Sequence, residues 1–316
     1  MWKPIHLVRP NTRINFMRWH RFAFVLAVIM TLGSIGLLAF KGLNFGIDFA
    51  GGILMEVRAP QPPALADMRE RLSGLGVGEV SLQSFGDPNT VLIRLPQQAG
   101  GEQEQQTAIS KVRAALGDGW DYRRTETVGP KVGSELVKNA IIAAGLAMAG
   151  IFAYVWIRYA WQFGVNALLA MIHDVVTTVG LFSLLGLQFD LATVAAILTV
   201  AGYSVNDKVV VFDRIRFEMR RYKTMPMGDV INLSVNETLS RTTVTAGLTL
   251  ISVIALFLFG GEVLHGFAIA LIWGITIGTY SSICIAAAGL LNLRHSKIRG
   301  DDQGAKDAGK GAARGA

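Results

Sequence analysis

The sequence contains little charge and a single cysteine, and both shortages limit what the protein can be. Only 17% of its 316 residues are charged and 51% are hydrophobic, whereas soluble domains carry about 25% charged residues. The mean hydropathy of +0.41 agrees with this imbalance. We therefore expect an integral membrane protein. The lone cysteine, Cys284, has no second cysteine in the chain with which to form a disulfide.

The net charge of +7 does not indicate a nucleic-acid partner, because the Lys and Arg residues fall between the apolar segments. In a membrane protein such residues set the orientation of the chain. They gather in the N-terminal segment, in the connection at about 213–240 and in the C-terminal tail, whereas the short loops near Gln188 and Glu262 have none. We therefore expect both termini and the 213–240 loop to lie in the cytoplasm.

Six apolar runs reach the length of about 20 residues that crosses a membrane. They cover roughly 22–40, 136–157, 163–185, 189–212, 241–259 and 267–291. This predicts a cytoplasmic segment over 1–21, a first transmembrane helix over 22–40 and a five-helix transmembrane domain over 136–293. The tail over 294–316 is basic and rich in Gly and Ala without a periodic pattern, so it is predicted to be disordered and cytoplasmic.

Residues 41–135 separate the first apolar run from the second and form one predicted external domain. Alternating and helical patterns predict strands over 53–58, 80–85, 90–95 and 122–127, and helices over 64–72 and 103–116. The resulting order βαββαβ is that of the α+β ferredoxin-like fold. The domain contains neither His nor Cys, so we expect no metal site there.

Asp207 is the most informative residue, because it lies in an apolar run where an unpaired acid costs several kcal/mol. Ser204 is three residues earlier and lies on the same helical face. Arg241, at the inner end of the next run, has the opposite charge at a matching depth. We expect an Asp207–Arg241 pair. It is either a static ion pair between two helices or a functional site, which is the default interpretation of intramembrane charge.

Two other groups of residues are candidates for function. His173 and Asp174 are adjacent near the middle of the third run, where they form either a proton relay or a hydrogen-bonded contact between helices. The segment 46–52, GIDFAGG, follows the first run. Its glycines suit a tight structural hinge between that run and the external domain, with Gly46, Asp48, Gly51 and Gly52 as the hinge residues.

Four motifs in the same order resemble those of the SecF family, the smaller members of the SecD–SecF protein-export pair. They are 46–52 (GIDFAGG, with Ala50 where the family has Thr), 204–216 (SVNDKVVVFDRIR), 240–242 (SRT) and 278–282 (GTYSS). The resemblance covers about residues 1–293. It implies six helices in the bacterial inner membrane, a periplasmic domain and membership of the proton-driven resistance–nodulation–division superfamily.

The resemblance also implies partners and a proton path. The implied partners are SecD, the Sec translocon channel, the exported unfolded polypeptide and a small accessory membrane subunit. Asp207 matches the family's proton-path acid and Arg241 its cationic partner; with them we place Ser204, Asp174 and His173. We expect no catalytic residue, no metal and no cofactor, with protons as the coupling ion.

Two other functions are compatible with parts of the sequence. The first is a stand-alone proton-driven exporter of small molecules or lipids from the same superfamily, which would work in liposomes without a partner. The second is an intramembrane enzyme built on His173 and Asp174, but the sequence offers no nucleophile at their depth. The favoured hypothesis is an auxiliary Sec subunit that uses the proton-motive force with SecD.

Overall fold

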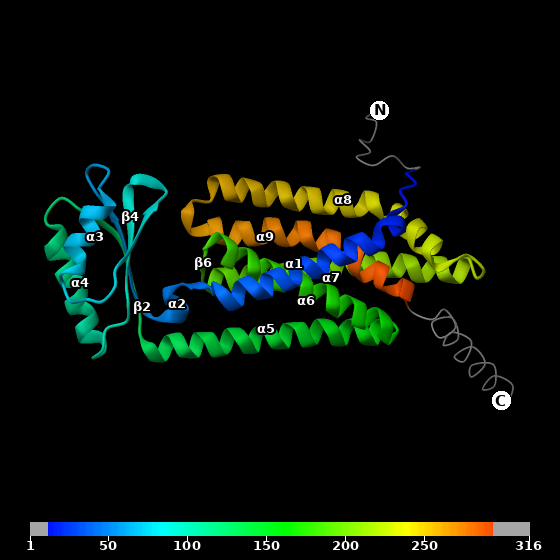
Figure 1. Ribbon diagram of the computed structural model, residues 1–316, viewed down its shortest axis with the longest axis horizontal. Helices are drawn as coiled ribbons and strands as arrows, with labels where there is room; N and C mark the ends of the chain where they lie inside the picture. The colour runs from blue at the N-terminus through cyan, green and yellow to red at the C-terminus, as the bar shows by residue number, and fades with distance from the viewer. Residues whose placement is uncertain (1–11, 293–316) are drawn as a thin grey trace, which may run out of the picture.

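Six long apolar helices form a bundle, and a four-stranded sheet domain lies at one end of it (Figure 1). The computed structural model describes residues 12–292. The helices are α1 (His20–Phe40), α5 (Pro130–Arg158), α6 (Trp161–Leu185), α7 (Leu191–Arg221), α8 (Met227–Phe259) and α9 (Glu262–Ser281). Each of the six is long and apolar enough to cross a membrane, which confirms the predicted fold class.

The sheet domain has the predicted ferredoxin-like topology. Its elements are β2 (Gly52–Arg58), α3 (Leu65–Ser73), β3 (Ser81–Phe85), β4 (Asp87–Leu95), α4 (Glu102–Leu116) and β5 (Asp121–Val128). The strands pair in the order β3-β4-β2-β5, and every pair is antiparallel. The β3–β4 connection is shorter than the predicted turn, because Asp87 already belongs to β4 and the chain reverses at Gly86 with φ +69°.

The sheet domain has its own core, formed by the inner face of the sheet and the apolar sides of α3 and α4. Ile53, Met55 and Val57 alternate along β2 and are fully buried, as are Leu72 of α3 and Val112 of α4. Alternation with period two on the strand and burial of one face on each helix explain why the pattern was visible in the sequence.

We expect residues 52–128 to fold alone, because their apolar core is separate from those of the helical bundle. The purified fragment should show mixed helix and strand in circular dichroism and one cooperative thermal transition. Val57→Asp, which buries a charge in that core, is the matched control and should remove the transition. A wild-type fragment without a cooperative transition would contradict the prediction.

The predicted loop at 213–240 is mostly helical. Helix α7 continues to Arg221 and α8 begins at Met227, so that only 222–226 connect them. The sequence of this segment is compatible with a helix on the membrane surface or with an extension of the fourth span, and the structure shows an extension. Its apolar face at Ile215 and Met219 belongs to one buried cluster with Val230 and Ile231 of α8. The two helices therefore extend beyond the apolar region as a hairpin.

Six short elements were not predicted. The segment after α1 forms β1 (Asn44–Phe45) and a helical turn, α2 (Ile47–Ala50), and β1 pairs in parallel with β6 (Gln188–Phe189) between α6 and α7. A 3-10 turn, η1 (Phe16–Trp19), precedes α1. Helix α9 passes into a π-helix, η2 (Ser282–Ala287), and then into η3 (Leu290–Asn292). π-Helical segments occur frequently at functional sites.

Some sequence predictions concern residues outside 12–292. These are the first half of the predicted 1–21 segment and the predicted disorder of 294–316.

Candidate functional site

A buried ion pair joins α6 to α7 in the middle of the bundle. Lys208 Nζ lies 2.9 Å from Asp174 Oδ2, and both side chains are completely buried. Asp174 is about 20 Å along α6 from Trp161, close to the centre of that helix. The pair therefore lies far from both ends of a hydrocarbon layer about 30 Å thick.

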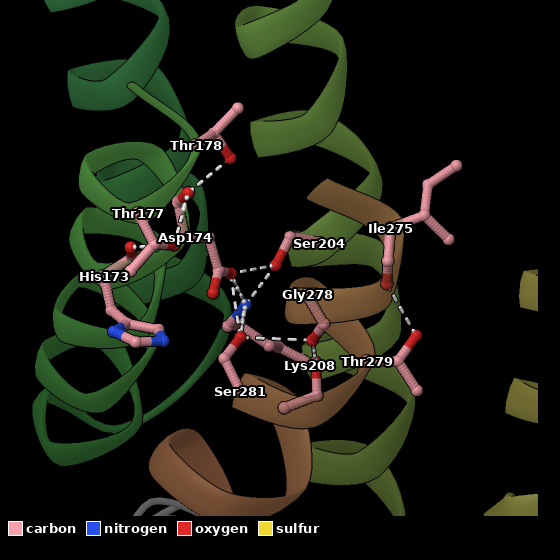
Figure 2. Close-up of polar contacts among 11 residues, drawn as sticks. His173, Asp174, Thr177, Thr178, Ser204, Lys208, Ile275, Gly278, Thr279 and Ser281 are labelled. Atoms are coloured by element: carbon pink, nitrogen blue, oxygen red, sulfur yellow. Dashed lines mark hydrogen bonds and ion pairs between the residues drawn. The ribbon is translucent and has the colours of Figure 1, made fainter. Parts of the chain in front are cut away.

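Two hydroxyls complete the surroundings of Asp174 (Figure 2). Ser204 Oγ on α7 donates to Asp174 Oδ2 at 2.6 Å, and Ser281 Oγ on α9 donates to the same oxygen at 2.8 Å. Lys208 donates to both hydroxyls, over 3.1 Å in the case of Ser281. Three helices thus meet at one carboxylate oxygen. We refer to Asp174, Ser204, Lys208 and Ser281 as the polar cluster.

Small residues let α9 approach α7 closely at the polar cluster. A Cβ at Gly278 would lie 3.1 Å from Ser204 Oγ, and one at Gly274 would overlap the side chain of Val200. Both glycines face α7, which is the packing that such spacing permits in membrane helices. Without this close approach Ser281 could not reach Asp174.

The second oxygen of Asp174 is unpaired. Oδ1 is buried and accepts no hydrogen bond from the residues that the structure describes. A buried carboxylate oxygen without a donor is costly. The polar cluster therefore leaves one oxygen of Asp174 without a partner from the described residues.

Asp207 lies one residue before Lys208 on α7 but faces a different helix. Its Oδ1 accepts a hydrogen bond from Thr242 Oγ1 on α8 at 2.7 Å. Its Oδ2 is buried, again without a donor in the described part of the chain. Ser282, at the start of the π-helix, is a further hydrogen-bonding neighbour of Asp207. Asp207 and Asp174 are thus two buried acids that contact different neighbours of α7.

The predicted pair of Asp207 with Arg241 does not form among residues 12–292. Arg241 is exposed, and the residue after it, Thr242, is the one that points at Asp207. Arg241 still acts on Asp207 electrostatically, as does Lys208. The matching depth was correct, but the rotation of α8 about its axis places the hydroxyl and not the guanidinium against the acid.

Arg241 lines an open groove between α7 and α8, on the side of Asp207 away from the sheet domain. The groove has a volume of about 340 Å³ and is lined by Val210, Asp213, Arg214, Phe217, Glu237, Thr238 and Arg241. Arg214 forms ion pairs across it with Glu237 and within α7 with Glu218, the latter at 2.6 Å. The lining begins with Val210, one helical turn from Asp207, and combines apolar side chains with four charged ones.

Ser204 and His173 have other partners than the sequence suggested. Ser204 contacts Asp174 and not Asp207. His173 instead contacts α1, where its Nδ1 lies 2.7 Å from Thr31 Oγ1. Because neighbouring helical residues point about 100° apart, His173 and Asp174 cannot act on one group. The proton-path role of both remains a prediction.

The four hinge residues lie together between α1 and the sheet domain. Asp48 belongs to α2, Gly46 precedes it, and Gly51 follows it with φ +71°. Gly52 is the first residue of β2, with φ +116°, and a Cβ there would lie 2.4 Å from Leu95 O. The pairing of β2 with β4 therefore requires a residue without a side chain at position 52. The hinge role of the segment remains a prediction.

Lys208 is the residue that the sequence argument missed. It is a buried cation in the apolar run that contains Asp207, so the rule that singled out Asp207 applied to it equally. Its spacing of four residues from Ser204 also placed the two on one face. The signal was present, whereas the partner on α6 could not be identified without the packing of the helices.

Comparisons with known proteins agree on one family. Residues 108–296 match the family described as protein export membrane protein SecD/SecF, C-terminal, and residues 36–62 match the SecD/SecF GG motif. Proteins named protein translocase subunit SecF are similar to this chain. The one from Rickettsia bellii is 41% identical over 93% of this chain and 98% of its own length, and that from Vibrio alginolyticus is 42% identical over 91% and 92%.

Solved structures of SecDF are also similar. The crystal structure of SecDF, a translocon-associated membrane protein from Thermus thermophilus, superposes with a TM-score of 0.82 at 36% identity. It matches 91% of this chain, which spans 39% of that longer chain. SecDF in a super-membrane-facing form superposes with a TM-score of 0.68 at 35% identity, over 97% of this chain and 41% of the other.

Proposed function

Because the chain belongs to the SecF family of protein translocase subunits, we propose that it uses the proton-motive force, together with SecD, to complete the export of unfolded polypeptides. The family is that of a transport subunit, which agrees with the prediction that the chain is not an enzyme. It is a multi-pass protein of the inner membrane.

The proposed orientation follows the basic residues. The sheet domain lies in the periplasm, and the α7–α8 connection, which carries Arg220, Arg221 and Lys223 at its start, lies in the cytoplasm with both termini. The groove at Arg241 then opens on the cytoplasmic side. In this orientation an inward gradient drives protons from the sheet-domain end of the bundle to the groove.

The observation that carries the proposal is the pair of buried acids next to Lys208, Asp174 on α6 and Asp207 on α7. Asp174 and Asp207 each have one carboxylate oxygen without a donor among the described residues. Lys208 directly follows Asp207 in α7 and forms an ion pair with Asp174. Protonation of either acid changes the net charge around Lys208 and so the packing of α7 against α6 or α8. Such a change can bias two arrangements of the helices.

The remaining steps use the rest of the molecule. The groove between α7 and α8 supplies a polar exit for a proton that leaves Asp207. The sheet domain moves relative to the bundle and acts on the exported polypeptide. The partners we propose are SecD, the Sec translocon channel and the unfolded polypeptide, with a small accessory membrane subunit. Protons are the only coupling species, and no cofactor or metal takes part.

The proposal is tested in proton-tight vesicles that contain this chain, its cognate SecD and the translocon. The energy source of the initial translocation step is removed after a preprotein has entered, and the fraction that completes transit is measured. We expect an inward proton gradient to raise this fraction severalfold, and a protonophore to reverse the rise. The matched control is the same vesicles without this chain.

Two outcomes would contradict the proposal. Completion that does not respond to the gradient would remove proton coupling. An equal response with and without this chain would place the coupling in another subunit. A response in vesicles that hold this chain without SecD or the translocon, measured with a small lipophilic substrate, would instead support a stand-alone exporter.

A further inference from the structure

The first turn of α7 is hydrogen-bonded to a residue of α2, the short helix that connects α1 and β1 to the sheet domain. Asp48 Oδ2 of α2 accepts a hydrogen bond from the backbone N–H of Leu191, the first residue of α7, at 3.0 Å. The N–H groups of the first helical turn have no partner within their helix. The negative charge also interacts favourably with the helix dipole. Asp48 therefore caps a helix that begins 143 residues later in the chain.

A second acid caps the same helix from within its own loop. Asp190 Oδ1 accepts from the Thr193 backbone N–H at 2.8 Å and from the Thr193 hydroxyl at 2.8 Å. Asp190 stabilises the helix start without linking it to any other element through this contact. Both acids cap the helix. Asp48 ties it to α2 by a hydrogen bond, whereas Asp190 reaches the sheet domain only through the attraction between its charge and Arg94.

Pairing and aromatic contacts surround the Asp48 bond and fix its geometry. The parallel pair β1–β6 lies beside it at the junction in Figure 1, and Gly46 N donates to Phe189 O at 2.8 Å. The ring of Phe189 contacts those of Phe45 and Phe49, with centroids 6.2 Å and 5.9 Å apart. A Cβ at Gly46 would lie 2.7 Å from the Gln188 amide. Segment 44–49 is therefore fastened to the start of α7.

The same segment leads directly into the sheet. Only Gly51 separates α2 from β2, a central strand bonded on both sides. From β4, the Arg94 guanidinium donates to Asn44 Oδ1 at 3.4 Å and to Gln188 Oε1. Burial lowers the pKa of Arg94, and the Asp190 carboxylate opposes this shift. The sheet domain thus contacts the start of α7 through α2 and through β4.

We propose that Asp48 is a positioning residue that transmits the movement of α7 to the sheet domain. This inference rests on the proposed function, because α7 is the helix that carries Asp207 and Lys208. Displacement of α7 at these charges moves its first turn, and the Asp48–Leu191 bond passes that displacement to α2 and β2. The route is direct, since only Gly51 separates α2 from β2.

The test compares Asp48→Ala with Asp190→Ala in the complete complex with SecD and the translocon. Both variants remove one cap of α7, so both should lower thermal stability by a similar, small amount. Only Asp48→Ala should lose gradient-stimulated completion, by at least fivefold, with assembly intact. Asp48→Asn keeps an acceptor oxygen but loses its charge, which weakens the bond by about half, and should retain an intermediate stimulation.

A second measurement does not depend on proton coupling. Spin labels at Gln106 of α4 and Ser252 of α8, both exposed and introduced in a Cys284→Ala background, report the distance between the sheet domain and the bundle. The distance distribution should broaden in Asp48→Ala and stay as in the wild type in Asp190→Ala.

The outcomes separate this inference from the proposed function. Wild-type stimulation in Asp48→Ala, or equal losses in Asp48→Ala and Asp190→Ala, would overturn the transmission role while the proposed function stands. If the wild type itself shows no stimulation, the proposed function fails, and an unchanged distance distribution in Asp48→Ala then overturns the tie as well. If Asp48→Ala does not assemble, Asp48→Asn decides: full stimulation in it overturns the inference, and a reduced one supports it.

Discussion

Asp207→Asn is expected to abolish the stimulation of translocation by a proton gradient while leaving assembly with SecD intact. The amide keeps an oxygen that can accept from Thr242, so the contact between α7 and α8 survives. The buried oxygen of Asp207 that has no donor among the described residues is replaced by a group that does not ionise near neutral pH. The helices then remain in one charge state regardless of the gradient.

Thr242→Val is the matched control, because it breaks the same hydrogen bond without removing the titratable group. It leaves the buried carboxylate without that donor, which should cost about 1–3 kcal/mol, and should leave a gradient response. The measurement is completed translocation with and without the gradient, beside the yield of copurified SecD. If Asp207→Asn keeps the gradient response and Thr242→Val does not, the acid is structural and the hydroxyl matters for another reason.

The sequence predicted the elements of this protein better than their contacts. Length and hydropathy were sufficient for six helices, because each helix must satisfy its backbone inside the membrane on its own. Alternation along β2 and one-sided burial on α3 and α4 predicted the ferredoxin-like domain for a similar reason, since each element shows its buried face locally. The missed elements β1, α2 and β6 are two to four residues long and carry no periodic pattern.

The contacts of the charged residues required the rotation of each helix about its axis. Depth along a helix can be counted from the sequence, but one residue changes the direction of a side chain by about 100°. Asp207 therefore contacts Thr242 rather than Arg241. The acid on α6, Asp174, is contacted by Lys208 rather than by a residue on the face of Asp207. The expected effect of replacing Arg241 on the stability of the protein therefore changes. Arg241→Ala, which the predicted pair made strongly destabilising, should change stability by less than about 0.5 kcal/mol at its exposed position.

Lys208→Met is expected to be the most destabilising single substitution in the bundle. It leaves Asp174 buried and facing two serines without its cation. Removal of one partner from a buried ion pair costs about 3–5 kcal/mol. We expect the variant to lose thermal stability, on the order of 10 °C for a chain of this size, and to copurify poorly with SecD.

The double variant Lys208→Met with Asp174→Leu distinguishes the structural from the functional role of the pair. Replacement of both charges by apolar side chains is often neutral or stabilising, and Ser281 can still donate to Gly278 O, from which it lies 3.1 Å away. We therefore expect thermal stability and assembly to return to near the wild-type level. The double variant should show no gradient response, because one of the two buried acids has been removed.

The two measurements bear on different claims. If Lys208→Met is as stable as the wild type, the ion pair does not hold α6 to α7, and Asp174 has taken up a proton or another donor. If the stable double variant still responds to the gradient, Asp174 is a structural acid and the coupling depends on Asp207 alone. Loss of the response in a complex that is fully assembled would instead show that α6 and α7 respond to protons together.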